Sequence, residues 1–359
     1  MTQEKWLIYG ATGYTGVLIA EAAVAKGHRP VLAGRSEAKL RALAGRLGLE
    51  YRVAGLRDEA ALDRMLAEVA LVLHAAGPFA QTAAPMVRAC LRNRAHYLDI
   101  TGEVPVFEHT LGLDAEARRA GVAVMSGVGF DVVPSDCLAK YVAEQLPSVT
   151  ALEIAVAGTS GVSAGTAKSA LEHLSRGALV RRNGHLVSRP VGSGARRIRF
   201  AQPGGQTSRE RSALIATWGD LATAYRSTGV PNITTYLSFP RRLVETARWA
   251  GPLAQWAARL RPVRALAQAW VGRTVTGPDA QRRRTAHAYV WARASGEHGA
   301  ERQAWLVTPE AYQLTVLASV ACVERVLAGG ISGATTPAAA FGADFVLKLP
   351  GVERYDNLP

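Results

Sequence analysis

The sequence predicts an α/β protein of two domains, the first built on a doubly wound parallel sheet of the Rossmann type. Short apolar runs alternate with helical patterns over residues 6–126, as expected for strands joined by crossover helices. A glycine-rich turn follows the first apolar run and opens the first helical pattern. The chain of 359 residues is also too long for one ordinary hydrophobic core.

The expected strands are short and apolar, as strands buried on both faces of a parallel sheet must be. They are predicted at residues 6–9, 30–33, 50–54, 70–76, 95–100 and 122–126. Apolar residues at helical spacing predict the intervening helices. These are expected at 14–26, from Ser36 onwards, and at 58–67, 81–94 and 107–120, the first with Val17, Ala20, Ala23 and Val24 on one face.

The glycine turn joins the first expected strand to the first expected helix. Its residues are Gly10, Ala11, Thr12, Gly13, Tyr14, Thr15 and Gly16. In this position, backbone N–H groups and the helix dipole can bind a pyrophosphate. The sequence therefore predicts a dinucleotide-binding site here; the alternative is a tight turn that binds no ligand.

The end of the second strand indicates which dinucleotide is bound. Sites for NAD carry Asp or Glu at this point, to bond the ribose 2′-hydroxyl. This chain has Arg35 and Ser36 instead, with Lys39 one helical turn later, and Glu37 is expected to point away. A guanidinium and a hydroxyl can bind a 2′-phosphate, so we expect NADP(H). The alternative is an arginine that is merely exposed at a strand end.

Three later strand ends are expected at the same rim of the sheet. The fourth strand ends in small residues that let a cofactor approach, followed by an aromatic ring for the nicotinamide: Ala76, Gly77, Pro78 and Phe79. The fifth and sixth lead into Glu103, Ser135 and Asp136, which are either site residues or helix caps.

The spacing of the cysteines and histidines argues against a disulfide-rich protein and against a metal-binding protein. Cys90, Cys137 and Cys322 lie far apart, and the eight histidines show no metal-ligand spacing, so neither a disulfide framework nor a metal site is expected. No signal peptide and no run of about 18 apolar residues is present, which predicts a cytoplasmic protein.

Positive charge is concentrated in one part of the chain. Residues 151–300 carry 22 Lys+Arg against 7 Asp+Glu, a net +15, whereas residues 1–150 are balanced. Such a region attracts an anionic partner: a phospholipid surface, an acidic carrier or nucleic acid. Nucleic acid is the least expected, because no recognition motif is present. The alternative is a solvated, arginine-rich surface.

Residues 241–273 form a basic helical insert. Trp249, Leu253, Trp256 and Leu260 recur at helical spacing among arginines, and Pro252 and Pro262 are expected to divide the stretch into short helices. This pattern suits a peripheral contact with an anionic membrane, or the binding of an acyl chain. The alternative is a helical cap packed on the protein's own core.

Other elements of the second half are predicted with less detail. We expect strands at 149–157 and 198–200, a helix at 165–176, hairpins and loops over 177–212, an apolar helix near 310–328 and a strand-like Phe345-Val346-Leu347. The last two are expected to pack on the body of the protein or in a homodimer interface.

Five motifs carry a family resemblance. GATGYTG, AGRSEAKL, AAGPF, YLDITGE and GFDVVPSD, in this order, resemble the saccharopine dehydrogenase-like oxidoreductases, and within them the branch of the trans-acting enoyl reductases. The resemblance implies an NADP-binding Rossmann domain over 1–133, an α+β substrate domain over 134–330 and a C-terminal segment, 331–359, that packs back on the body.

The resemblance also implies a reaction. An enoyl reductase delivers hydride to the β-carbon of an unsaturated, polyketide-type acyl thioester, and its substrate rides on an acidic acyl carrier protein or coenzyme A. A saccharopine-type enzyme instead acts on a C–N bond of an imine. Outside enzymology, an NADP(H)-sensing protein or a lipid-surface protein remains open.

The proton donor is the least defined part of the site. Asp131 and Tyr97 are candidates for it. A carboxyl group donates near neutral pH only if burial raises its pKa, and a tyrosine only if a nearby cation lowers its own.

Overall fold

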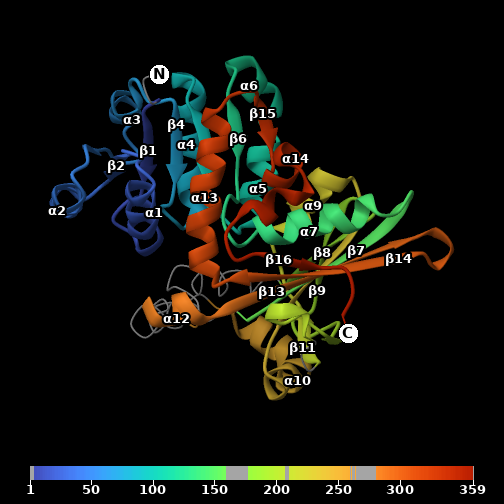
Figure 1. Ribbon diagram of the computed structural model, residues 1–359. Helices are drawn as coiled ribbons and strands as arrows, with labels where there is room; N and C mark the ends of the chain where they lie inside the picture. Colours follow the sequence, from blue (N-terminus) through green and yellow to red (C-terminus); the bar gives the residue numbers. More distant parts are fainter. Residues whose placement is uncertain are drawn as a thin grey trace. The chain divides into compact units, whose positions relative to one another are not determined.

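The computed structural model describes residues 4–158, 177–206, 210–258, 260, 263 and 280–358 (Figure 1). The chain forms two compact units, Met1–Val133 with Leu314–Ala340, and Pro134–Gln313 with Phe341–Pro359. Residues 314–330, which we expected in the second domain, therefore belong to the first unit. Within the described residues, no helix is long and apolar enough to cross a bilayer.

The first unit is built on a seven-stranded sheet of order β15-β6-β5-β4-β1-β2-β3, and all its recorded pairings are parallel. The strand order turns in both directions from β1, which makes the fold doubly wound, as predicted. The strands are β1 (Trp6–Tyr9), β2 (Val31–Gly34), β3 (Tyr51–Val53), β4 (Leu71–His74), β5 (His96–Asp99), β6 (Ala123–Met125) and β15 (Gly333–Thr335).

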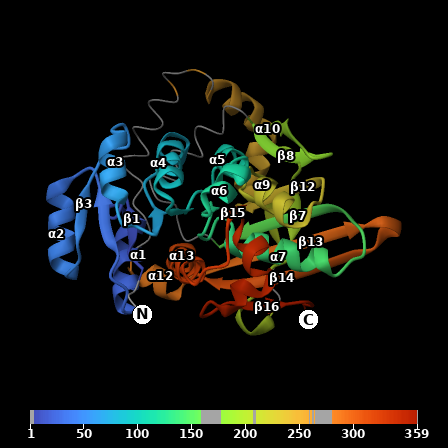
Figure 2. The ribbon, with the colours of Figure 1, turned by 90° about the horizontal axis from the view of Figure 1, so that it is seen from above.

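Helices cover both faces of this sheet. They are α1 (Tyr14–Ala25), α2 (Glu37–Leu47), α3 (Glu59–Leu66), α4 (Phe79–Asn93), α5 (Val104–Leu111), α6 (Asp114–Ala120) and α13 (Ala311–Leu327). Figure 2 shows α1 and α13 on one face and α3 and α4 on the other. Lys26 and His28, which follow α1, both contact the carboxylate of Glu324 on α13.

Two details of these helices differ from the prediction. The expected helix at 107–120 is two helices, because α5 ends at Leu111 and α6 begins at Asp114. The buried face of α1 contains Gly16, Ile19, Ala20 and Ala23, while Val17 and Val24 are only half-buried. Gly16 lies so close to the glycine turn that a Cβ atom there would overlap the carbonyl oxygen of Gly10.

The last strand of the sheet comes from the far end of the chain. β15 pairs with β6, and the backbone N–H of Ala334 donates to Oδ1 of Asp114 over 2.8 Å. Gly333 has φ +95°, a conformation that glycine adopts readily. The C-terminal segment thus supplies the edge of the first unit's sheet, followed by α14 (Pro337–Phe341).

The second unit is built on a nine-stranded mixed sheet. Its main path is β10-β11-β12-β7-β13-β14-β16, and β8 pairs with both β12 and β9. The strands are β7 (Val149–Ala157), β8 (Ala178–Arg182), β9 (His185–Arg189), β10 (Arg196–Ile198), β11 (Arg211–Ile215), β12 (Asn232–Ser238), β13 (His287–Gly296), β14 (Glu301–Pro309) and β16 (Glu353–Tyr355). The helices are α7 (Val133–Glu144), α9 (Asp220–Thr228), α10 (Arg241–Ala258) and α12 (Ala280–Thr285).

Several predictions for this unit change. Pro252 does not divide the basic insert, because α10 continues through it. Residues 345–347 lie in a 3-10 helix, Ala343–Lys348, not in a strand. The second expected strand is Arg196–Ile198 and ends before Phe200. The helix expected at 165–176 and most of 259–273 lie outside the described residues.

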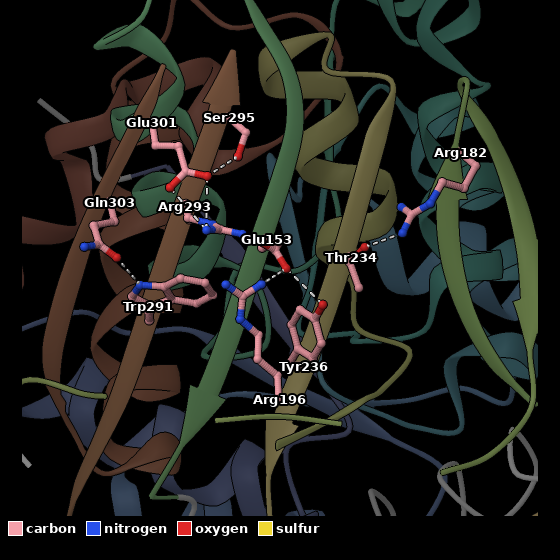
Figure 3. A network of polar contacts seen from close by, with 10 residues as sticks. All are labelled: Glu153, Arg182, Arg196, Thr234, Tyr236, Trp291, Arg293, Ser295, Glu301 and Gln303. Atoms are coloured by element: carbon pink, nitrogen blue, oxygen red, sulfur yellow. Dashed lines mark hydrogen bonds and ion pairs between the residues drawn. The ribbon is translucent and has the colours of Figure 1, made fainter. Parts of the chain in front are cut away.

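A polar network centred on Glu153 of β7 joins five strands of this sheet (Figure 3). Its carboxylate accepts hydrogen bonds from Arg293 on β13, Arg196 on β10 and the hydroxyl of Tyr236 on β12. Arg293 also pairs with Glu301 on β14. Burial acts to raise the pKa of Glu153, but the two guanidinium groups outweigh it and lower the pKa.

Candidate dinucleotide-binding site

The glycine turn lies where the sequence places it, between β1 and α1. The backbone N–H of Gly10 donates to the carbonyl of Ala33 over 2.8 Å, which ties the turn to the end of β2. Gly10 has φ +86°, and a Cβ atom there would lie 2.8 Å from the Cβ of Ala76. A Cβ on Gly16 would overlap the carbonyl oxygen of Gly10. These two glycines are therefore required by close packing, with or without a ligand.

Gly13 and the start of α1 provide the anion-binding feature. Gly13 is the N-cap of a 12-residue helix, makes no side-chain cap and is followed by no acidic residue in the first turn. The first N–H groups of a helix have no partner within the helix, and its dipole favours negative charge at this end. A Cβ on Gly13 would meet only the carbonyl oxygen of Gly10, at 3.3 Å, so the backbone faces open space. This cradle fits a pyrophosphate.

The end of β2 presents two cations and a hydroxyl to solvent. Arg35, Ser36 and Lys39 are exposed, and Ser36, at the N-cap position of α2, makes no side-chain cap. Glu37 bonds to Arg41, one turn along the helix, at 2.5 Å. The one carboxylate of this segment accepts a hydrogen bond from a neighbouring arginine, and Arg35, Ser36 and Lys39 fit a ribose 2′-phosphate.

The end of β4 adds an apolar wall. β1 lies between β2 and β4, so the predicted segment Ala76–Phe79 is at the same edge of the sheet as the turn. The ring centroid of Phe79 lies 5.4 Å from that of the buried His74. Burial lowers the pKa of His74 to about 3, so its ring is neutral.

Glu103 holds the start of α4 in place. Its carboxylate accepts the backbone N–H groups of Phe79 at 3.0 Å and Ala80 at 2.9 Å. Pro78, the N-cap of that helix, has no side chain for this purpose. Glu103 therefore caps a helix other than the one that follows it in sequence, and it positions Phe79.

Tyr97 does not meet the condition for a proton donor. It is fully buried, its hydroxyl donates to Oδ2 of Asp99 over 2.9 Å, and His74 lies 3.2 Å away. Burial, followed by the charge of Asp99, raises the pKa of Tyr97 well above its usual value. The nearby cation that would lower it is absent among these recorded partners. Tyr97 is a buried hydrogen-bond donor to Asp99.

Asp99 joins the ends of β5 and β6. Besides Tyr97, it accepts hydrogen bonds from the hydroxyl of Ser126 and from the backbone N–H groups of Thr101 and Gly127. Burial raises the pKa of Asp99, and these hydrogen bonds oppose the rise. Neither Asp99 nor His74 was predicted as a site residue, because their only signal in the sequence is their position at a strand end.

Asp131 meets the condition for a proton donor. Burial raises the pKa of its carboxyl group to about 6. The side chain lies against Gly102, where a Cβ atom would come within 2.6 Å of Oδ2. Its loop is braced from α13, because the hydroxyl of Thr315 accepts the N–H of Phe130 over 3.1 Å. Asp131 is partly exposed and lies beyond the carboxyl end of β6, at the same sheet edge as the glycine turn.

Ser135 and Asp136 lie in the first turn of a helix, α7. Both belong to α7 in the second unit, where Ser135 donates to Asp220 over 2.7 Å and Asp136 accepts from Ser227 over 2.5 Å. All of Ser135, Asp136 and Asp220 are fully buried. They join α7 to α9 within the second unit.

Comparison with known proteins identifies the first unit. Residues 6–125 match the family model described as the saccharopine dehydrogenase NADP binding domain. A protein of Mycobacterium leprae named trans-acting enoyl reductase is 35% identical over 138 residues, covering 36% of this chain and 33% of that protein. A Caenorhabditis elegans protein named lipid droplet localized protein is 31% identical over 150 residues, covering 38% of this chain and 35% of the relative. The matches thus span about a third of these relatives.

The whole chain has a counterpart among solved structures. Saccharopine dehydrogenase from Saccharomyces cerevisiae superposes with a TM-score of 0.65 at 14% identity, covering 98% of this chain and 100% of that one. That likeness confirms the fold, a parallel Rossmann-type sheet with a second mixed-sheet domain. Residues 6–125 of this chain belong to the saccharopine dehydrogenase NADP-binding domain family.

Proposed function

We propose that this protein is an NADPH-dependent reductase of an α,β-unsaturated acyl thioester. The observation that carries the proposal is the pairing of a dinucleotide cradle with Asp131, a carboxyl group of pKa about 6, at one edge of one sheet. The resemblance to proteins named trans-acting enoyl reductases supports the choice of substrate.

Three features of the chain bind the cofactor in this proposal. The backbone from Gly13 into α1 would hold the pyrophosphate, Arg35 and Ser36 with Lys39 would hold the 2′-phosphate, and Phe79 would pack against the nicotinamide. When bound, NADPH supplies a hydride. Glu103 contributes indirectly, because it fixes the first turn of α4 on which Phe79 lies.

Asp131 supplies the proton. As hydride reaches the β-carbon, the electron pair of the C=C bond moves toward the α-carbon and the thioester carbonyl. The protonated carboxyl of Asp131 then forms the new C–H bond at the α-carbon, and the resulting carboxylate regains its proton from water. A pKa of about 6 keeps a usable protonated fraction near neutral pH.

The carrier of the substrate is proposed from charge. Residues 151–300 have a net charge of +15, and Arg189, Arg197 and Arg199 are exposed on or beside strands of the second unit. Acyl carrier protein and coenzyme A are both anionic, so such a surface attracts them.

The reaction is tested with purified protein, NADPH and crotonyl-coenzyme A, by following NADPH absorbance. We expect oxidation of NADPH that depends on the thioester. The value of kcat should fall about tenfold per pH unit above pH 6, because Asp131 must be protonated.

Asp131→Asn should lower kcat by roughly 10²–10⁴-fold with unchanged NADPH affinity. Oxidation with a cyclic imine but with no enoyl thioester would reassign the reaction to a C–N bond. Tight NADPH binding without turnover on either substrate would indicate a sensor.

Cofactor choice is tested by Arg35→Asp. Loss of the charged hydrogen bonds, about 1.5–3 kcal/mol, should weaken NADPH binding by roughly 10–150-fold and leave NADH binding unchanged. Arg46→Ala is the matched control, because Arg46 is an exposed arginine at the other end of α2 and pairs with Glu21. An unchanged ratio of the two dissociation constants in Arg35→Asp would remove the basis for NADP specificity.

A further inference from the structure

The helix α10 buries small residues. Its inner face consists of Val244, Gly251 and Ala258, and Figure 1 shows the helix beside β11 in the second unit. A Cβ atom on Gly251 would overlap the carbonyl of Val191, and the side-chain oxygen of Gln255 accepts the N–H of Val191 over 3.2 Å. This close packing fixes which face of α10 points outward.

The outer face carries the large apolar side chains. Trp249 is 90% exposed, Leu253 68% and Trp256 59%, at positions i, i+4 and i+7 of one helical stripe. No described residue covers them. A helix that caps its own core has the opposite arrangement, with large apolar residues inside and polar ones outside. Among the described residues, this face of α10 does not have the arrangement of a packed cap.

The charges beside the stripe select an anionic partner. Arg241, Arg242 and Arg248 lie on the helix against one carboxylate, Glu245, which pairs with Arg241 at 2.7 Å. Tryptophans with flanking arginines are the composition of helices that lie in the interface of an anionic membrane, since the indole rings enter the headgroup region and the arginines meet the lipid phosphates.

We propose that α10 binds the surface of an anionic phospholipid bilayer, lying parallel to it with Trp249, Leu253 and Trp256 inserted. The charge argues against a second copy of the chain as occupant, because the same arginines would face each other. Such a contact would bring the protein to a lipid surface without a membrane-spanning helix. It is independent of the proposed reaction.

The proposal is tested by co-sedimentation with vesicles of phosphatidylcholine alone and of phosphatidylcholine with one quarter phosphatidylglycerol. We expect wild-type protein to partition at least tenfold more strongly onto the anionic vesicles. Trp249→Ser combined with Trp256→Ser should lower that partition at least tenfold, and Arg242→Glu combined with Arg248→Glu should remove the preference for anionic lipid. Val187→Ser is the control, because Val187 is an exposed apolar residue that lies on β9 and not on α10.

NADPH binding and circular dichroism show whether each variant is folded, because neither depends on the outer face of α10. Equal sedimentation of wild type and the double tryptophan variant, or no binding of wild type to anionic vesicles, would overturn the proposal. So would a wild-type dimer in light scattering that the tryptophan variant converts to a monomer, because the face would then belong to a second copy.

Discussion

The carboxyl group of Asp131 lies directly against the Cα atom of Gly102, so that a Cβ atom at residue 102 would be 2.6 Å from Oδ2 and 3.0 Å from Cγ. The loops after β5 and β6 therefore meet at a glycine and a carboxyl group. Any side chain at 102 must displace the carboxyl.

Gly102→Ala should accordingly lower activity more than stability. The Asp131 side chain can rotate away, so we expect a loss of unfolding free energy of about 1 kcal/mol or less, near the low end for overpacking. A displaced proton donor should cost on the order of 10²-fold in kcat, with NADPH affinity retained. Gly45→Ala, in α2 where an added Cβ meets nothing within 4 Å, is the control and should leave kcat unchanged. Full activity of Gly102→Ala would show that the position of Asp131 does not matter.

The raised pKa of Asp131 also predicts a pH-dependent stability. In the native state its pKa is about 6, above the value of about 3.9 in an unfolded chain, so the native state holds this proton where the unfolded state has lost it. This contribution to stability is complete below pH 4 and is lost as pH rises to about 6. Asp131→Asn should therefore stabilise the protein at pH 8 by on the order of 2 kcal/mol, and not at pH 4. Urea unfolding of wild type and variant at both pH values measures this change in unfolding free energy. An equal effect of the substitution at pH 4 and pH 8 would show that the pKa of Asp131 is not raised in the native state.

Two glycines of the turn should fail in different ways. Gly16→Ala places a Cβ on the carbonyl of Gly10, which cannot rotate away, so α1 must shift and we expect a stability loss of about 1–3 kcal/mol. In Gly13→Ala the Cβ meets only one atom, at 3.3 Å, and the protein should fold normally. That Cβ instead occupies space that a pyrophosphate needs, so NADPH affinity should fall by roughly 10-fold or more. Thermal unfolding measures the stability of each variant, and cofactor titration measures its affinity for NADPH. If Gly16→Ala and Gly13→Ala lost the same affinity and neither lost stability, the packing role of Gly16 would be contradicted.

The Glu153 network should stabilise the second unit. Glu153→Gln leaves Arg196 and Arg293 without their shared carboxylate, and we expect a loss of about 2–4 kcal/mol at pH 7. Because the native pKa of Glu153 is lowered, its contribution is present above the unfolded value of about 4.3 and is lost as pH falls below it. Glu301→Gln, at a more exposed carboxylate, should cost about 1 kcal/mol or less. A Glu153→Gln variant as stable as wild type at pH 7 would show that the network has no net effect.

Local patterns predicted most of the first unit. Each strand is a short apolar run with a crossover helix after it, so β1 to β6 and the helices between them follow from sequence, as does the edge where the turn, Arg35 and Phe79 lie. β15 could not be found in this way, because its three residues pair with a strand about 200 positions earlier and carry no signal of their own. Leu314–Leu327 was assigned to the second domain, because nothing local in its sequence shows that it packs on a unit formed by much earlier residues.

Local sequence signals were less informative in the second unit. Pro252 was expected to divide the basic insert, but α10 continues through it. Ser135 and Asp136 were predicted to be either site residues or residues at a helix N-terminus, and both lie in the first turn of α7. For Asp131 and Tyr97, sequence named the right chemical condition but could not say which of them meets it, since burial and neighbours decide a pKa.

The proposed function requires this protein to transfer hydride from NADPH to an unsaturated acyl thioester. The most direct test is mass spectrometry and NMR of the product formed from crotonyl-coenzyme A with NADPH deuterated at C4, in parallel for each face of the ring. We predict one deuterium at the β-carbon from one of the two labelled forms, and a solvent proton at the α-carbon. Saturable NADPH binding with no deuterium in the acyl product from either form would contradict the claim.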